Sequence, residues 1–324
     1  MPGGTNGDAG RPLNRPLRAL VGTTASGKTE LGIALAERLA TKQDDEQKAE
    51  IVSVDSMLVY RGMDVGTAKP TAGQRDRVRH HLLDLVDPQE AFSVAEFQRH
   101  GVAALEDIRR RGAAPLLVGG SGLYFRALVD RLEFPGTDPA VRSDLETVAS
   151  AVGAERLHER LAAFDPVAAG RIDPANTRRT VRALEVAAVT GRPFSSYATA
   201  WERYPASNVR VAGIDLAAEV LDARVARRVD AMVARGFLEE VEGLVRRGFG
   251  SWLTSSQAIG YAEMTRHLNG LCSVDEAIEG TVRRTRALAR RQRAWFRRDP
   301  RVRWFEASDP ASLQEEIAGY LSDG

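Results

Sequence analysis

The sequence predicts an α/β fold in which a mainly parallel sheet is interrupted by an inserted, all-helical subdomain. Short apolar runs alternate with amphipathic helical patterns over most of the 324 residues, and this alternation is typical of strands joined by crossover helices. The alternation stops between about residues 131 and 205, where Ala, Arg, Glu and Leu dominate with helical spacing. A glycine-framed, hydroxyl-rich segment lies between the first apolar run and the first helical pattern.

Six short apolar runs are the expected strands. They are RALV at 18–21, EIVSV at 50–54, HLLDLV at 81–86, PLLV at 115–118, VRVAGIDL at 209–216 and RVRWFEA from Arg301. The first helical pattern directly follows the glycine-framed segment, and its apolar face consists of Leu31, Ala34, Leu35 and Leu39. Apolar residues recurring every three or four positions indicate a helix that packs one face on the sheet.

Two turn-rich segments, EFPGTDP at 133–139 and RYPASN at 203–208, mark the expected edges of the insertion. Turn residues are common where a chain leaves one compact unit and returns to it. We therefore expect a core of residues 17–130 and 206–324 and a helical insertion of residues 131–205. Residues 1–16 are expected to form a flexible tail, and TKQDDEQKAE at 41–50 an exposed loop.

The composition limits the class of protein. A hydrophobic fraction of 43% permits a well-buried core, and a net charge of +1 means that binding to a polyanion would depend on local clusters of charge. The single cysteine, Cys272, excludes an internal disulfide and a multi-cysteine zinc site. No run approaches the roughly 20 apolar residues of a membrane helix, and no secretory signal is recognised. We expect a cytoplasmic protein with no membrane partner.

The residues Gly22 to Thr29, G-T-T-A-S-G-K-T, match the complete phosphate-loop pattern between a strand and a helix. Backbone N–H groups of such a loop and the positive end of the following helix together form an anion site. Lys28 supplies a mobile positive charge, and the Thr29 hydroxyl can bind Mg²⁺. The core is therefore expected to resemble P-loop NTPases, although the loop alone does not distinguish ATP from another nucleotide or from a diphosphate without a nucleoside.

The carboxyl ends of the other strands supply further candidates, because ligands of open α/β sheets bind at that edge. Asp55 follows the second strand and could hold Mg²⁺ through water, act as a general base, or serve only as a turn residue. The glycines of VGGSG at 118–122 could admit a ligand or form a structural turn. Ser121 offers a hydroxyl there, and Arg126 on the next helix could reach a diphosphate.

A basic segment lies near the C-terminal end. The residues from Val282 to Arg298, VRRTRALARRQRAWFRR, contain eight arginines and no acid. At about 100° per residue the arginines gather on one half of a helix, which could bind RNA phosphates or be a solvated, salt-bridged face. A second basic cluster, Arg178, Arg179 and Arg182, lies on an expected helix of the insertion. His80 and His81 lack metal-ligand neighbours and are expected to pack or to form hydrogen bonds.

Several segments together resemble one family, the bacterial tRNA dimethylallyltransferases. They occur in order between Leu20 and Arg298, and are GTTASGKT, VSVDSMLVYRGMDVGTAKP, HHLLDLVDP, LLVGGSGLYFRAL, RRTVRALEV and SSQAIGYAE. The second is far more specific than the phosphate loop. Two departures are visible: Thr23 replaces the proline usual in the family, and Ser121 replaces a threonine but keeps the hydroxyl. In SSQAIGYAE, Gln257 and Tyr261 could belong to a pocket or to the core, and only the resemblance favours a role towards RNA.

The resemblance implies transfer of a dimethylallyl group from dimethylallyl diphosphate to the exocyclic N6 amine of an adenosine in tRNA. The adenosine would lie 3′ of the anticodon, at tRNA position 37, in tRNAs that read codons beginning with U, and the product would be N6-(dimethylallyl)adenosine. Mg²⁺ is the implied cofactor, with Thr29 as the one ligand named. The implied partners are the anticodon stem-loop of tRNA and dimethylallyl diphosphate, and we expect a monomer.

The resemblance also implies roles for individual residues. Asp55 would be the base, assisted by Thr24, Lys28 and Arg126. The diphosphate would be bound by Gly22, Thr23, Thr24, Ala25, Ser26, Gly27, Lys28 and Thr29. The residues expected to contact tRNA are Asp55, Ser56, Met57, Leu58, Ser121, Arg142, Arg178, Arg179, Thr180, Val181 and Arg182. The insertion would clamp the anticodon stem-loop, and the target adenosine would have to unstack and turn into the pocket.

Three other functions use some of the same features. A nucleoside or nucleotide kinase would share the phosphate loop, a strand-end aspartate and an arginine-bearing lid. An isopentenyltransferase acting on free adenine nucleotides would share the chemistry without an RNA partner. An RNA-binding ATPase would explain the loop and the arginines but not the DSMLVYRGMDVGTAKP segment.

Overall fold

The structure is a computed structural model that describes residues 16–41, 49–197, 203–205, 207–307 and 309–322. The chain divides into two compact units. One unit takes the chain up to Val129 together with the part from Ser207 onward, and the other takes Asp130–Ala206. The expected tail lies outside the described residues except for Pro16, and so does most of the expected loop at 41–50.

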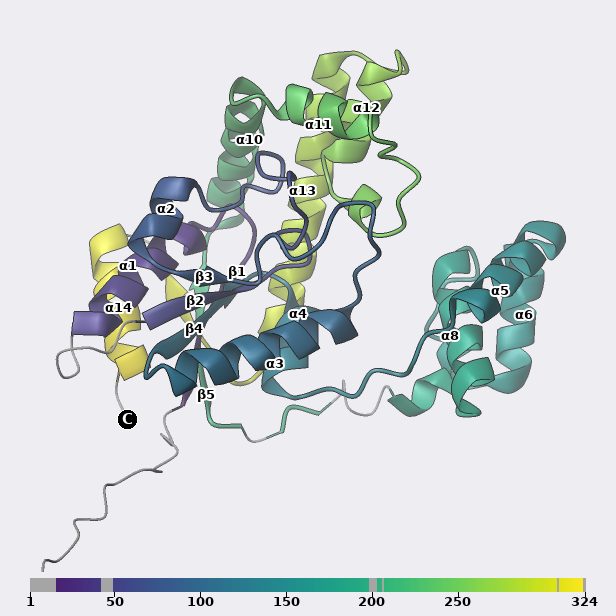
Figure 1. The fold of residues 1–324 in the computed structure, drawn as a ribbon, viewed down its shortest axis with the longest axis horizontal. Coiled ribbons are helices and arrows are strands. Elements are labelled where there is room, and N and C mark those ends of the chain that lie inside the picture. The colour runs from purple at the N-terminus through teal and green to yellow at the C-terminus, as the bar shows by residue number, and fades with distance from the viewer. Residues whose placement is uncertain (1–15, 42–48, 198–202, 206, 308, 323–324) are drawn as a thin grey trace, which may run out of the picture. The chain divides into compact units, whose positions relative to one another are not determined.

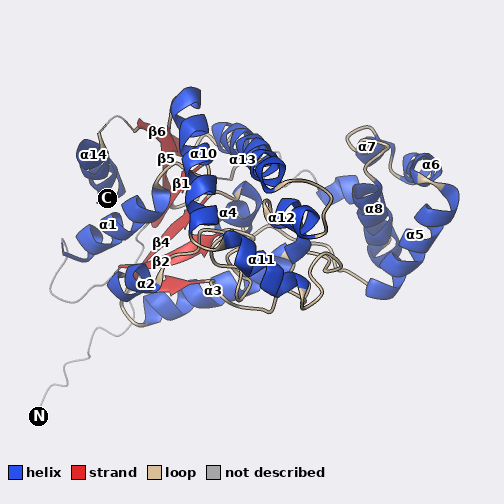
Figure 2. Ribbon diagram, turned by 90° about the horizontal axis from the view of Figure 1, so that it is seen from above, coloured by secondary structure: helices blue, strands red, loops and turns tan. Residues whose placement is uncertain are grey.

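The first unit is built on a six-stranded sheet in which every neighbouring pair is parallel. The order across the sheet is β3-β2-β4-β1-β5-β6, and Figure 2 shows β2, β4, β1, β5 and β6 side by side. This arrangement confirms the expected α/β class with a P-loop-like core. The strands are β1 (Leu17–Gly22), β2 (Ala49–Val54), β3 (His80–His81), β4 (Ala114–Gly119), β5 (Val209–Asp215) and β6 (Val302–Glu306).

The third expected strand, at 81–86, is mostly a loop. Only His80 and His81 pair with β2, because Leu82 and Asp84 adopt positive φ angles of 64° and 54° that end the strand. Leu82 is nevertheless buried, and Val86 forms a single bridge with Tyr60. The apolar pattern therefore reflects a loop that packs on the core, which apolar periodicity alone does not distinguish from a strand.

Helices cover both faces of the sheet. α1 and α14 pack on one face, and α3, α4 and α13 lie on the other, as Figures 1 and 2 show. α10, α11 and α12 gather around α13. The helices of this unit are α1 (Lys28–Thr41), α2 (Ala72–Arg77), α3 (Val94–Arg110), α4 (Gly122–Val129), α10 (Ala218–Ala234), α11 (Phe237–Val245), α12 (Tyr261–Leu268), α13 (Val274–Arg297) and α14 (Pro310–Ser322), with a 3₁₀ turn, η2, at Ser255–Gln257.

Local sequence explains where α3 and α13 begin. Ser93 and Ser273 precede α3 and α13, and each side-chain oxygen accepts the backbone N–H three residues later. In turn, the side chains of Glu96 and Glu276 accept the backbone N–H of Ser93 and Ser273. Such reciprocal capping satisfies two N–H groups that the first helical turn leaves without partners.

In the described residues of the second unit, every regular element is helical. Its elements are α5 (Pro139–Val152), α6 (Ala154–Phe164), α7 (Pro166–Ala169), α8 (Thr177–Thr190) and the 3₁₀ turn η1 (Phe194–Tyr197). It has a hydrophobic core of its own, which includes Leu145, Leu157, Leu161 and Leu184. The bounds of this unit lie one residue outside those expected for the insertion at each end.

The glycines that follow β4 are needed mainly for packing. A Cβ on Gly119 would lie 2.1 Å from the carbonyl oxygen of Val54 in β2. A Cβ on Gly120 would lie 2.6 Å from Nε2 of Gln292, and one on Gly122 would lie 1.8 Å from Cδ1 of Trp295. These distances favour the structural interpretation of VGGSG, because the space that the missing side chains leave is taken by β2 and α13.

We expect Gly122→Ala to lower the free energy of unfolding by about 1–3 kcal/mol, because overpacking displaces the Trp295 indole from a buried contact. Urea unfolding followed by tryptophan fluorescence measures the change. Gly73→Ala is the matched control: Gly73 lies in α2, and a Cβ there would meet no heavy atom within 4 Å. Equal stability of the two variants would contradict the packing role.

Candidate active site

One cavity joins the carboxyl ends of β1, β4 and β2, which are neighbours in the sheet. Its volume is about 420 Å³. The phosphate loop and the segment after β2 both open into it, as the sheet topology predicts for ligands of this fold class. The expected site residues that line it are Thr24, Lys28, Thr29, Asp55, Ser56, Met57 and Leu58.

The phosphate loop has the curved backbone that an anion site requires. Ala25 and Gly27 both have positive φ angles, 61° and 92°, and α1 begins directly after them at Lys28. Ser26 carries a buried hydroxyl oxygen for which the described part of the chain supplies no hydrogen-bond partner. A buried polar atom without a partner is costly, so the loop suits a ligand that brings oxygen atoms.

Gln292 of α13 anchors the phosphate loop from the other side. Its Oε1 accepts a hydrogen bond from the backbone N–H of Thr24 at 2.8 Å. Gln292 itself lines the cavity.

Three cationic side chains converge on the loop. Lys28 Nζ donates to the carbonyl of Thr23 at 3.0 Å, and Arg224 Nη1 donates to the carbonyl of Ser26 at 3.3 Å. Arg228 lines the cavity from the next turn of α10. The loop therefore has more positive charge around it than Lys28 alone provides.

Burial and mutual repulsion perturb these cations. Desolvation, with a smaller effect from nearby Arg228, lowers the pKa of Lys28 to about 8, while Asp55 opposes the shift. Burial also lowers the pKa of Arg228, again opposed by Asp55. A dianionic ligand would relieve this repulsion, because it supplies the opposite charge that the cluster lacks.

Asp55 lies directly after β2 and lines the cavity. Its Oδ1 accepts the backbone N–H of Met57 at 2.9 Å, which fixes the orientation of the carboxylate through a short turn. Two of the alternatives for Asp55 are thus compatible: it is a turn residue, and it also presents a carboxylate to the same cavity as Lys28.

Arg126 lies elsewhere. Its side chain is 1% exposed within α4, and Arg126 does not line the cavity. The last turns of α4 bury every residue from Phe125 to Leu128, so burial in the protein interior replaces the expected contact with a diphosphate. Ser121 does not line the cavity either.

Arg224 and Arg228 are two further cations beside the phosphate loop that were not expected from the sequence. They were missed because they lie about 200 residues after the phosphate loop. The sequence does contain a signal for these two arginines. They are four residues apart on α10 and lie on either side of the buried Val225 in the sequence. The corrected cationic set therefore combines one lysine of the loop with two arginines of a distant helix.

In the second unit, the expected tRNA contacts divide into buried and exposed residues. Thr180 and Val181 are buried, so their side chains cannot meet an RNA in this structure. Arg142 and Arg182 both pair with Oε2 of Glu185, at 2.7 and 2.9 Å, and Glu185 is itself 0% exposed. Arg178 and Arg179 are exposed in the first turn of α8, so their side chains are accessible to a ligand.

The arginines of the basic segment Val282 to Arg298 are partly neutralised, as the salt-bridged interpretation expects. Five of the eight form ion pairs, namely Arg283, Arg284, Arg286, Arg293 and Arg297, with Glu279, Glu263, Asp222 and Asp215. Arg290, Arg291 and Arg298 form no ion pair within the described residues. Arg284 and Arg291 also line the cavity, so this helix brings positive charge to the rim of the site.

The histidines form hydrogen bonds, as expected. His81 Nε2 lies 2.6 Å from Glu50, and His80 Nδ1 lies 2.7 Å from the carbonyl of Val78. Among the described residues, no cluster of three His, Cys, Asp or Glu side chains is arranged to hold a metal ion. No described helix is long and apolar enough to cross a membrane.

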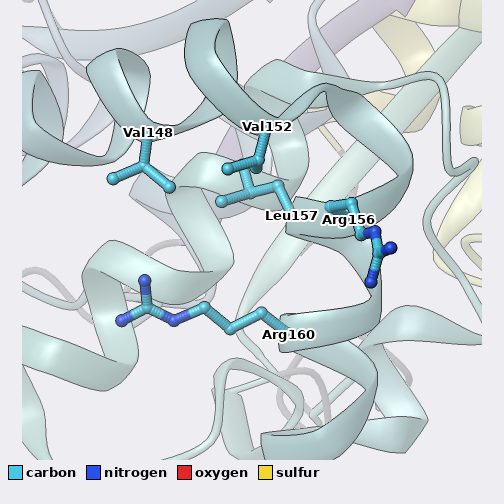
Figure 3. Close-up of a pocket in the computed structure, with 5 residues that line it drawn as sticks. All are labelled: Val148, Val152, Arg156, Leu157 and Arg160. Atoms are coloured by element: carbon cyan, nitrogen blue, oxygen red, sulfur yellow. The ribbon is translucent and has the colours of Figure 1, made fainter.

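A second, open pocket of about 510 Å³ lies on the helical unit. Figure 3 shows its lining: Val148 and Val152 from α5 face Leu157 of α6, with Arg156 and Arg160 at the edges. It contains no carboxylate, thiol or hydroxyl group, and therefore lacks the groups needed for acid–base or nucleophilic chemistry. The first cavity is the candidate active site.

Fold and site together define an α/β protein of the P-loop class, whose phosphate cradle shares a cavity with a carboxylate. The model of the IPP transferase family matches residues 58–299, and the chain belongs to this family. It is 49% identical over 307 residues to a tRNA dimethylallyltransferase of Nocardioides sp., covering 95% of this chain and 96% of the relative. It is also 49% identical over 315 residues to one of Kineococcus radiotolerans, with coverage of 96% and 98%.

Solved structures agree with this assignment. The tRNA isopentenylpyrophosphate transferase of Bacillus halodurans is 40% identical with a TM-score of 0.66, and the match covers 95% of this chain and 97% of that chain. A eukaryotic dimethylallyltransferase, described as acting on tRNA, is 25% identical with a TM-score of 0.74 and coverage of 92% and 75%. The family resemblance seen in the sequence is thereby confirmed.

Proposed function

We propose that this chain transfers a dimethylallyl group from dimethylallyl diphosphate to the exocyclic N6 amine of the adenosine 3′ of the anticodon in tRNAs that read codons beginning with U. The observation that carries the proposal is that a cationic phosphate cradle and a fixed carboxylate share one cavity. The wall of that cavity also includes the apolar side chains of Val229, Met232 and Leu288. An adenine ring and a five-carbon allyl group both need such apolar surface.

On the donor side, the bond between the allylic carbon and the diphosphate oxygen breaks, and the diphosphate leaves with its electron pair. Lys28, Arg224 and Arg228 are arranged around the loop that would hold this leaving group. Donors preorganised for developing charge typically contribute several kcal/mol to catalysis. Thr24 lines the same cavity, and its hydroxyl is proposed to hydrogen-bond the diphosphate.

On the acceptor side, the amine nitrogen attacks the allylic carbon, and its proton must leave. The adenine amine is a weak nucleophile because its lone pair is delocalised into the ring. Asp55 is proposed to take the proton, and the Met57 N–H bond to Oδ1 fixes its carboxylate in the cavity. Proton transfer to a positioned base typically accelerates a reaction by about 10²- to 10⁴-fold.

Mg²⁺ is the proposed cofactor. The described residues offer no cage of three acidic or imidazole ligands, whereas Thr29, which carries a hydroxyl, lines the cavity beside the loop. This sparse set would suit Mg²⁺, which usually takes only one or two ligands from the protein. When bound, the ion would neutralise charge on the leaving group, and Thr29 would hold it in place.

The test incubates the protein with labelled dimethylallyl diphosphate, Mg²⁺ and one of three acceptors: bulk tRNA, AMP or ATP. Label in tRNA, located by nuclease digestion and mass spectrometry at the adenosine 3′ of the anticodon, is the expected result. Label in AMP would instead identify an enzyme of free nucleotides. Turnover of ATP without transfer of label would favour a kinase or an ATPase.

The second unit is proposed to contact the anticodon stem-loop, and the exposed Arg178 and Arg179 support this. We expect Arg178→Glu combined with Arg179→Glu to raise the KM for tRNA and to lower the slope of log KM against log salt by about one per lost phosphate contact. Arg160→Glu, an exposed arginine of α6, is the control. An unchanged salt slope in the double variant would remove this pair from the interface.

A further inference from the structure

One wall of the cavity is a loop that a carboxylate outside the cavity holds in place. We call residues 63–70 the wall loop, because Gly66, Thr67, Ala68 and Pro70 line the cavity. Glu240 of α11 does not line it. Its Oε2 accepts the backbone N–H groups of Asp64 and Val65, each at 2.8 Å, and its Oε1 accepts that of Gly66 at 3.1 Å.

The same carboxylate also binds Tyr261, which lines the cavity beside the wall loop. The Tyr261 hydroxyl donates to Glu240 Oε1 at 2.6 Å, and burial followed by the charge of Glu240 raises the pKa of Tyr261 well above its usual value. Four donors from two segments therefore converge on one side chain. Hydrogen bonds to an ionised acceptor are about twice as strong as those between neutral groups.

Packing adds a geometric constraint at the same point. Phe237 and Tyr261 stack edge to face, with ring centroids 5.1 Å apart. A Cβ on Gly66 would lie 2.1 Å from the Phe237 ring and 2.6 Å from the Tyr261 ring. The backbone of the wall loop thus lies directly on this aromatic pair, with no room for a side chain at residue 66.

The other end of the wall loop is fixed independently of Glu240. Lys69 has a side chain that is 1% exposed, and its Nζ donates to the Tyr60 carbonyl, to Asp64 and to Asp84 at 2.6–2.7 Å. Gly66 is the last residue that Glu240 binds, and only Thr67 and Ala68 lie between it and Lys69, in a turn where the Ala68 N–H donates to the Val65 carbonyl and the Thr67 hydroxyl to the Met63 carbonyl. Loss of the Glu240 anchor would consequently loosen Gly66 and this short turn without releasing the whole loop.

We propose that Glu240 is a positioning residue, which sets the place of the cavity wall at Gly66, Thr67 and Ala68 by binding three successive backbone N–H groups and the Tyr261 hydroxyl. Glu240 touches no residue of the phosphate loop in the described contacts and acts through the wall loop and Tyr261. The kinetic consequence rests on the proposed function, whereas the structural consequence does not.

The structural test is hydrogen exchange of the wall loop in Glu240→Gln, in which an NH₂ group replaces one acceptor oxygen. We expect the amides of residues 64–66 to exchange about tenfold or more faster, because a lost charge-assisted hydrogen bond lowers the free energy of local opening. Glu242→Gln is the matched control: it makes the same chemical change on α11 at an exposed residue that pairs only with Arg246 in the described contacts. Glu240→Asp keeps the carboxylate and is expected to exchange at an intermediate rate, so a poorly folded Gln variant does not decide the test.

The kinetic test measures KM separately for dimethylallyl diphosphate and for an anticodon stem-loop RNA. A positioning role predicts that Glu240→Gln raises at least one KM by about tenfold while kcat at saturation changes less than threefold, and that Glu240→Asp restores part of the loss. Unchanged exchange at residues 64–66, or unchanged values of both KM, would overturn the proposal. If the wild-type protein transferred no label at all, the proposed function would fail, and the exchange result would still decide whether Glu240 holds the wall loop.

Discussion

Asp55→Asn is expected to lower kcat for transfer to tRNA by about 10²- to 10⁴-fold while leaving the affinity for tRNA nearly unchanged. Asparagine has almost the same shape, and its amide oxygen can still accept the Met57 N–H that orients Asp55 at 2.9 Å. It cannot accept a proton from the adenine amine. Single-turnover transfer of labelled dimethylallyl groups measures the chemical step, and a filter-binding titration measures tRNA affinity.

Two further variants separate the proposed role of Asp55 as a base from its role in the turn. Asp55→Ala also removes the turn bond, so a larger loss than in Asp55→Asn would reveal how much orientation contributes. Asp87→Asn alters an exposed carboxylate that pairs with Arg61 and Arg247, and it is expected to leave kcat unaffected. Turnover by Asp55→Asn close to that of the unmodified protein would remove Asp55 from the role of base.

Lys28→Ala is the second variant for which we expect a large effect, a fall of about 10²- to 10³-fold in kcat/KM for dimethylallyl diphosphate. The ammonium of Lys28 lies within the phosphate loop, where it contacts the Thr23 carbonyl, and the partly buried site strengthens its attraction for a leaving diphosphate. Steady-state kinetics at saturating tRNA measure the change. Arg290→Ala, a change of an exposed α13 cation that does not line the cavity, is the control and should have no such effect.

The pH dependence provides an independent check on Lys28. Its pKa is lowered to about 8, mainly by desolvation, so the side chain loses its positive charge as the pH rises through that value. Because kcat/KM reports the ionisation of the free enzyme, kcat/KM for the diphosphate should fall above about pH 8. Lys28→Arg keeps its charge over this range and should abolish the fall. A profile that is flat from pH 7 to 10 in the unmodified protein would contradict this role.

The sequence sufficed for the parts of the site that are continuous in the chain. The phosphate loop joins one strand to one helix, and Asp55 ends the neighbouring strand, so local pattern and sheet topology together place them at one edge. Gln292, Arg224 and Arg228 could not be placed in this way, because α10 and α13 reach the loop only through tertiary packing. Glu240 was missed for the same reason, since its partners are backbone groups, which no pattern of side chains reveals.

Charged residues were the least predictable from sequence. Arg126 follows a strand end, as a ligand-binding arginine would, yet it is buried in α4. The family resemblance implies a tRNA contact for Arg142 and for Arg182, yet both pair with the fully buried Glu185. A charge count treats all arginines alike, whereas the distribution of acids in three dimensions decides which of them remain free to bind a polyanion.

The hydrogen bond between Gln292 and Thr24 connects α13 directly to the phosphate loop. Arg284 and Arg291 lie on the same helix as Gln292. We expect a helix of this length to move as one rigid body. A polyanion that binds those guanidinium groups and displaces α13 would therefore also displace the Thr24 N–H that is bonded to Gln292. Under the proposed function, α13 would thus connect the side of the cavity that binds tRNA with the loop that binds the diphosphate.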